Sequence, residues 1–74
     1  MADFEPGKLV ILKSIPPGLL NGLPAEDRSA ILSIVGRPVA FAGYRFGQAE
    51  LEFVDSAGDD HTIWVEPSFL EHVR

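Results

Sequence analysis

Alternating apolar and polar residues in the last third of the chain constrain its fold more than any other feature. Leu51 and Phe53 alternate with two glutamates, and further along Ile63 and Val65 alternate with a threonine and a tryptophan. Period-two alternation is typical of strands that are buried on one face and exposed on the other. The pattern therefore predicts a β-hairpin with one core face and one wet face.

The connection between the two arms predicts a tight turn. Residues 55–58 begin with Asp and end with Gly58, as in a type I turn followed by a glycine bulge. This turn would pair Asp55 with Asp59 and Leu51 with Ile63. A slightly longer loop would shift the strands by two residues and pair Phe53 with Ile63. Both registers keep the same side chains in the core, so both remain open.

The chain has 74 residues and no cysteine, which limits how it can be stabilised. A chain of this length forms one domain with a small core, and disulfides or thiolate metal sites cannot supplement that core. We therefore expect a single domain over 1–74, with 1–6 flexible. A deep enclosed active site is not expected in so small a domain.

The remaining elements give a mainly β fold with one inserted helix. Apolar residues on both faces predict a well-covered first strand over 8–13, and a second strand is expected over 39–46 with a bulge or bend at Gly43. Between them, a helix over about 24–35 is expected to end at Gly36. Its core-facing stripe is predicted to contain Ile31, Leu32, Ile34 and Val35. The second strand and the two arms of the hairpin would form an antiparallel meander.

The segment after the hairpin carries a family resemblance. Trp64-Val65, then Pro67-Ser68, then Phe69-Leu70 resembles the carboxyl end of SH3-like small antiparallel barrels. The resemblance implies a short 3₁₀ turn near 67–70 and a final strand. Glu66 is an extra residue against the usual spacing, and the chain lacks the paired tryptophans and the Ala-Leu-Tyr-Asp-Tyr-like run of peptide-binding SH3 domains. The resemblance thus implies the barrel fold and not proline-peptide binding. The chain also resembles short, uncharacterised bacterial proteins.

Charge is distributed unevenly along the chain. Residues 1–48 have a net charge of +1, whereas residues 49–74 have −6, because seven acids there face a single arginine. An acidic hairpin repels phosphates, so a basic protein is a better partner than nucleic acid.

The longest apolar run near the start covers residues 9–12, far short of the ~20 residues of a membrane helix. We expect a cytoplasmic monomer or weak homodimer with no membrane contact.

The residues best suited to bind a metal ion lie at the hairpin tip. Asp55, Asp59, Asp60 and His61 are the best metal candidates, but turn geometry already explains the Asp and Gly residues there. His61 shares the parity of Ile63, which predicts a histidine at the inner rim, hydrogen-bonded to a carboxylate or carbonyl. No serine lies in a nucleophile-elbow context and no cofactor motif is present, so we expect no cofactor and no enzymatic activity.

Trp64 is the strongest candidate for a binding residue. If Ile63 and Val65 are core, Trp64 faces outward among carboxylates, as expected of a hot spot for an Arg- or Lys-bearing protein. Alternatively, Tyr44, the helix or the tail covers Trp64. The expected partner-binding residues are Trp64, Tyr44, Glu50, Glu52 and Glu66.

Two other functions remain open at this point. One is a ligand or metal sensor at the 55–61 loop. The other is an RNA- or ribosome-associated small barrel, since small barrels often bind RNA. The basic residues for that role would be Lys8, Lys13, Arg37 and Arg45.

Overall fold

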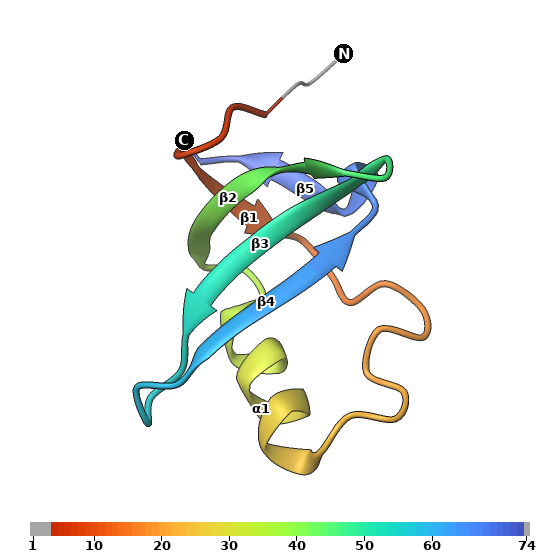
Figure 1. Ribbon diagram of the computed structural model, residues 1–74, viewed down its shortest axis with the longest axis vertical. Helices are drawn as coiled ribbons and strands as arrows, with labels where there is room; N and C mark the ends of the chain where they lie inside the picture. The colour runs from red at the N-terminus through yellow and green to blue at the C-terminus, as the bar shows by residue number, and fades with distance from the viewer. Residues whose placement is uncertain (1–3, 74) are drawn as a thin grey trace.

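A computed structural model describes residues 4–73, which form one five-stranded antiparallel sheet and one α-helix (Figure 1). The elements in chain order are β1 (Leu9–Leu12), α1 (Ala25–Ile34), β2 (Pro38–Arg45), β3 (Gln48–Val54), β4 (Asp60–Val65), the 3₁₀ turn η1 (Pro67–Phe69) and β5 (Leu70–His72). The predicted mainly β fold is confirmed, as are the helix between the first two strands and the 3₁₀ turn near 67–70.

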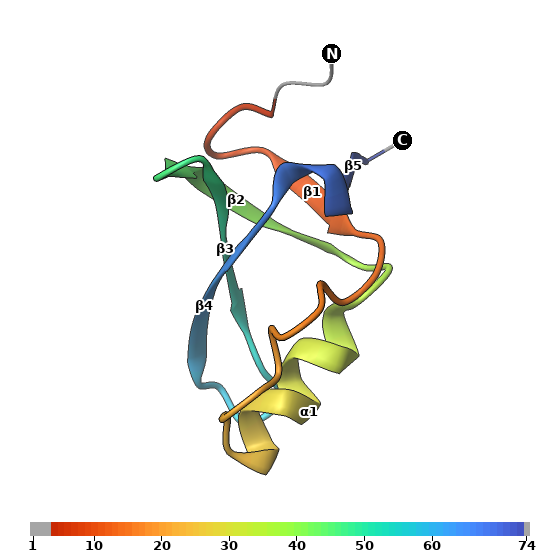
Figure 2. The same cartoon turned by 90° about the vertical axis from the view of Figure 1, so that its right-hand side faces the viewer.

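The sheet is open, which corrects the predicted closed barrel. The strand order is β4-β3-β2-β1-β5, so β4 and β5 are the two edges. The sheet curls until β1 and β5 lie across from β3 and β4, and α1 closes the lower end (Figure 2). The edges do not pair because η1, which begins with Pro67, carries the chain away from β4 to β1. Closure would have required β5 to return beside β4.

The hairpin register follows the first of the two predicted alternatives. Leu51 pairs with Ile63 and Phe53 pairs with His61. The Gly58 amide donates to the Asp55 carbonyl at 3.0 Å, as a type I turn over 55–58 requires, and the Asp55 amide donates to the Asp59 carbonyl at 3.0 Å, which closes the loop. Gly58, in the same turn, has a φ of +88°, a left-handed conformation that favours glycine.

A bulge in β2 decides which side chains share a face. The register shifts between Phe41, which pairs with Leu51, and Gly43, which pairs with Glu50. The bulge predicted at Gly43 is therefore confirmed. Ala42 is the extra residue, and it reverses the side-chain alternation for the rest of the strand. As a result Tyr44 lies on the inner face, where its ring is 5.0 Å from that of Phe41.

The core fills the concave side of the curled sheet. The fully buried Phe41 and Leu51 each stabilise the fold by about 1.5–3 kcal/mol through removal of apolar surface from water. Helix α1 contributes Ala30, Ile31 and Ile34 to this core. Leu32 is exposed, which corrects its place in the predicted stripe; the described helix turns this residue away from the sheet.

Backbone contacts at the end of α1 join this helix to the sheet. Gly36 adopts a φ of +82° after the helix, and its amide donates to the Leu12 carbonyl at 3.0 Å. The predicted helix end at Gly36 is thereby confirmed, and this bond ties the helix end to β1. Pro24 precedes the first helical residue, and its carbonyl accepts the Arg28 amide.

The amino-terminal segment reaches the core through an aromatic residue. Of the segment 1–6 expected to be flexible, residues 1–3 lie outside the described residues. Phe4 is 5% exposed, its ring lies 5.9 Å from that of Phe41, and its amide donates to the Tyr44 hydroxyl at 3.1 Å. This position therefore contributes to packing, which the sequence did not predict.

Candidate functional site on the outer face of the β3–β4 hairpin

The outer face of the β3–β4 hairpin carries an aromatic residue among carboxylates. Pairing in the ladder places Glu50 beside Trp64 and Glu52 beside Thr62. Directly opposed residues of antiparallel strands project to the same side of the sheet, so these four residues form one surface. We call this set, Glu50, Glu52, Thr62 and Trp64, the acidic-aromatic face.

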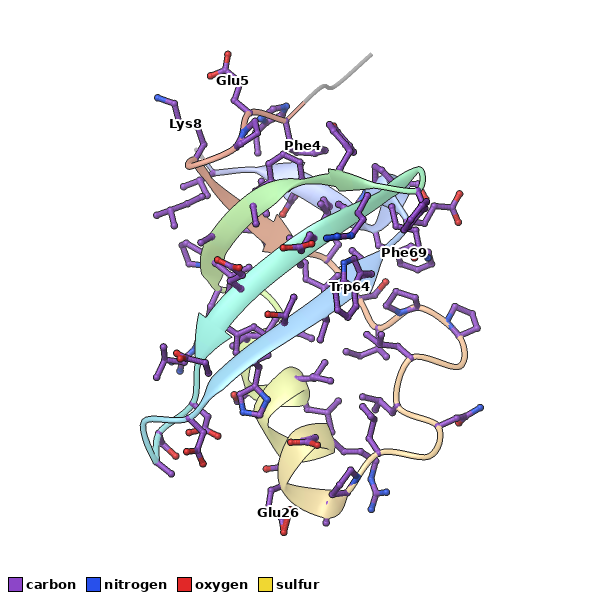
Figure 3. The ribbon with its side chains drawn as sticks, in the orientation of Figure 1. Phe4, Glu5, Lys8, Glu26, Trp64 and Phe69 are labelled. Atoms are coloured by element: carbon purple, nitrogen blue, oxygen red, sulfur yellow. The ribbon has the colours of Figure 1, made fainter. Side chains whose placement is uncertain are left out.

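Trp64 is exposed at this face and held in a defined orientation. Trp64, labelled in Figure 3, is 44% exposed. Its Nε1 donates a hydrogen bond of 3.1 Å to Oε1 of Glu50. Tyr44 does not cover it, because the bulge places that ring on the other side of the sheet. The indole therefore presents much of its surface to solvent.

A third residue completes the cluster at Glu50. An Arg45 guanidinium nitrogen lies 3.8 Å from the Glu50 oxygen that accepts the indole hydrogen bond. The Arg45 side chain is largely exposed, so this ion pair contributes at most about 1 kcal/mol. The carboxylate of Glu50 thus accepts the indole hydrogen bond and also lies beside a cation of the same chain.

The structure brings together only some of the predicted binding residues. Trp64, Glu50 and Glu52 share one face. Tyr44 lies on the opposite face, so its predicted place beside Trp64 is wrong in this fold. Glu66 is exposed beyond the end of β4, where it precedes η1 and its carbonyl accepts the Phe69 amide. It borders the face at one end.

Sequence reasoning missed an exposed aromatic residue at the β2–β3 turn. Phe46 is 97% exposed and has a φ of +52°, a conformation that costs a non-glycine residue about 1–2 kcal/mol. With Gly47 at +78° it forms a two-residue turn of type I′ geometry. The missed signal was a phenylalanine directly before glycine in a short connection between strands, where asparagine or glycine is preferred.

At the opposite end of the hairpin, His61 sits between two carboxylates. Its Nε2 lies 2.8 Å from Oδ2 of Asp55, and its Nδ1 lies 3.7 Å from Oδ1 of Asp27 in α1. Its ring stacks on Phe53 with centroids 5.1 Å apart. The predicted inner-rim histidine bonded to a carboxylate is confirmed, while the contact with the helix was not predicted.

The environment of Asp55 favours its ionised form. The hydrogen bond with His61 lowers the pKa of Asp55 below its ordinary value of 3.8, and the Asp59 amide acts in the same direction. Its Oδ1 also accepts the Ala57 amide at 2.9 Å. Asp55 is thus an organising residue of the turn, with its oxygens already engaged. Within residues 4–73, no group of three His, Cys, Asp or Glu side chains is arranged to hold a metal ion.

The basic residues considered for RNA binding do not form one patch. Lys13 and Arg37 flank the bond between Leu12 and Gly36, whereas Lys8 lies at the other end of β1. Arg45 is paired with Glu50 on the acidic-aromatic face. A phosphate backbone would therefore meet separated charges.

Comparisons of the chain with protein family models, with curated proteins and with solved structures find no match. In the part of the chain that the structure describes, no helix has the length and apolar character needed to cross a membrane.

Proposed function

We propose that this protein is a non-catalytic interaction module that binds a basic, Arg- or Lys-bearing protein through its acidic-aromatic face. The observation that carries the proposal is the half-exposed indole of Trp64, fixed by Glu50 on a face where Glu52 is also exposed. Tryptophan is enriched among residues that dominate binding energy, and burying it in an interface removes a large apolar area from water.

The chemistry of this face favours a cation as the ligand group. A guanidinium or ammonium over an indole face is attracted by the ring quadrupole, by about 0.5–1 kcal/mol at an exposed site. The carboxylates of Glu50 and Glu52 lie on the same surface and would pair with neighbouring cations. The negative charge of the carboxyl-terminal region would also accelerate encounter with a basic partner.

We further propose that the fold is related to SH3-like barrels in an opened form. The 3₁₀ turn between β4 and β5, and the pairing of β5 with β1, support this relation. Because fold alone does not assign function, the binding proposal depends on Trp64 and its neighbours and not on this relation.

Affinity capture from the native cell tests the proposal with two variants. Trp64→Ala removes the indole, whereas Leu32→Ala truncates a similarly exposed apolar side chain on α1. We expect a basic protein to be captured by wild type and by Leu32→Ala and to be lost with Trp64→Ala. Equal capture by all three proteins would contradict the proposal.

A further inference from the structure

The β4 edge of the sheet is long, regular and without a partner strand in residues 4–73. β4 has six residues and ends the strand order, whereas β5 at the other edge has three. Its pairing with β3 is continuous from Asp60 to Val65, with no bulge, and no proline interrupts it. Proteins commonly protect free edges with bulges, prolines or short strands, and β4 has none of these.

The hairpin register determines which backbone groups face this edge. Antiparallel pairs alternate between bonded and non-bonded positions. Asp55 and Asp59 are a bonded pair, so His61, Ile63 and Val65 bond to β3. Thr62 and Trp64 therefore direct their amide and carbonyl groups away from β3. Across residues 4–73, the backbone hydrogen bonds outside the regular elements do not involve any residue of β4.

Both sides of this edge are acidic. On the outer side, Glu50 and Glu52 lie across from Trp64 and Thr62. On the other side, a cleft between β4 and the start of α1 is lined by Asp27, Asp59 and Glu26, the last of which is labelled on the helix in Figure 3. A segment lying along β4 would meet carboxylates on both of its faces, which selects for Lys and Arg.

A second copy of the chain fits this edge less well than a basic segment does. Pairing two β4 strands would bring together two hairpins from the region with a net charge of −6, and like charges across an interface are costly. The charge around the edge therefore favours a partner of opposite sign.

We propose that the free edge of β4 is a docking strand to which an extended Lys- or Arg-rich segment of the partner protein adds in β conformation. This inference rests on the proposed function and specifies how the same site binds. The backbone groups of Thr62 and Trp64 provide the added ladder, and alternate side chains of the segment reach the indole and the carboxylates. Main-chain bonds would supply affinity, while the acidic surroundings would supply selectivity.

Two synthetic peptides separate strand addition from side-chain binding alone. The first alternates Arg and Val over roughly eight residues, about the length of a strand. The second has the same sequence with every backbone nitrogen methylated, which keeps the charges but removes the donors. We expect wild type to bind the first peptide and to bind the second at least about tenfold more weakly.

Amide hydrogen exchange locates the added ladder. On binding the first peptide, the Thr62 and Trp64 amides should become protected, whereas the Ile63 amide, bonded to β3 in the free protein, should change little. Thr62→Pro removes an edge donor and should weaken binding about tenfold relative to Thr62→Ala, since proline is tolerated on edge strands. If the proline variant fails to fold, the exchange data on wild type still decide the question.

Three results would overturn the inference. Equal binding of both peptides would exclude strand addition while leaving the proposed function intact. Binding of neither peptide would contradict both proposals. Protection of the Thr62 and Trp64 amides in the free protein, together with a dimeric mass, would show that a second copy occupies the edge.

Discussion

The two faces of the β3–β4 hairpin are built from alternate residues of the same strands, but they differ in what accounts for their residues. On the inner face, Leu51 and Ile63 pair and are buried, so packing explains them fully. On the outer face, Trp64 is half-exposed beside Glu50, where packing gives no reason for an indole. Alternation therefore identifies the core, while Trp64 is a residue that the core does not explain and to which a binding role is proposed.

The largest effect is expected from truncation of the inner face. Leu51→Ala should lower the free energy of unfolding by about 2–5 kcal/mol, because it removes buried methyl groups and leaves a cavity. Glu52→Ala, at the adjacent outward position, should change it by less than about 0.5 kcal/mol. Urea denaturation measures both. Equal effects would mean that the two faces do not differ in packing.

A smaller effect is expected at the exposed β2–β3 turn. Phe46→Asn should stabilise the protein by about 1 kcal/mol, because asparagine tolerates the positive φ and suits a type I′ turn before glycine. Phe46→Val should destabilise it, since a β-branched residue tolerates that conformation poorly. Loss of stability in Phe46→Asn, measured by the same denaturation, would show that the ring packs on the protein.

The contact between Asp55 and His61 near the hairpin turn should make the free energy of unfolding depend on pH in the acid range. Because the folded pKa of Asp55 is lowered below 3.8, the folded state binds fewer protons there than the unfolded state. The stabilisation is therefore fully present above pH 3.8 and is lost as the pH falls through the lowered value. Asp55→Asn should remove this dependence, and His61→Gln should reduce it, in urea midpoints measured against pH. An unchanged profile in Asp55→Asn would exclude this origin.

The smallest effect is expected at the cation already held on the outer face. Arg45→Gln should strengthen binding of the alternating Arg-Val peptide by roughly two- to fivefold, because it frees Glu50 and removes a like charge. Lys13→Gln changes the net charge equally but lies away from this face, so it serves as the control in a calorimetric titration. Equal gains in both variants would assign the effect to net charge alone.

Local signals in the sequence predicted much of the fold. Alternation identified the inner residues of the hairpin. The Asp and Gly of the turn predicted two possible strand registers, and the structure has the first of them. Gly43 indicated the bulge, and Gly36 indicated the end of the helix. These features depend on residues close together in the chain, so backbone geometry specifies them.

Features that depend on distant segments were not predicted. Gly43 indicates a bulge, but the face on which Tyr44 lies depends on the register with β3 beyond the bulge, and the predicted face of Tyr44 is wrong for that reason. Closure into a barrel depends on how far the sheet curls and where η1 directs the chain, which no local pattern specifies. The contact of Asp27 with His61 joins a helix to a hairpin more than thirty residues away.

Fluorescence of the single tryptophan tests the proposed binding role of the outer face most directly. Since Trp64 is the only tryptophan in the sequence, its emission reports on this site alone. Acrylamide quenching should be efficient in the free protein and should fall when the alternating Arg-Val peptide is bound, because the segment covers the indole. Quenching that stays unchanged while the peptide is bound would show that binding occurs elsewhere and would contradict the assignment of this face.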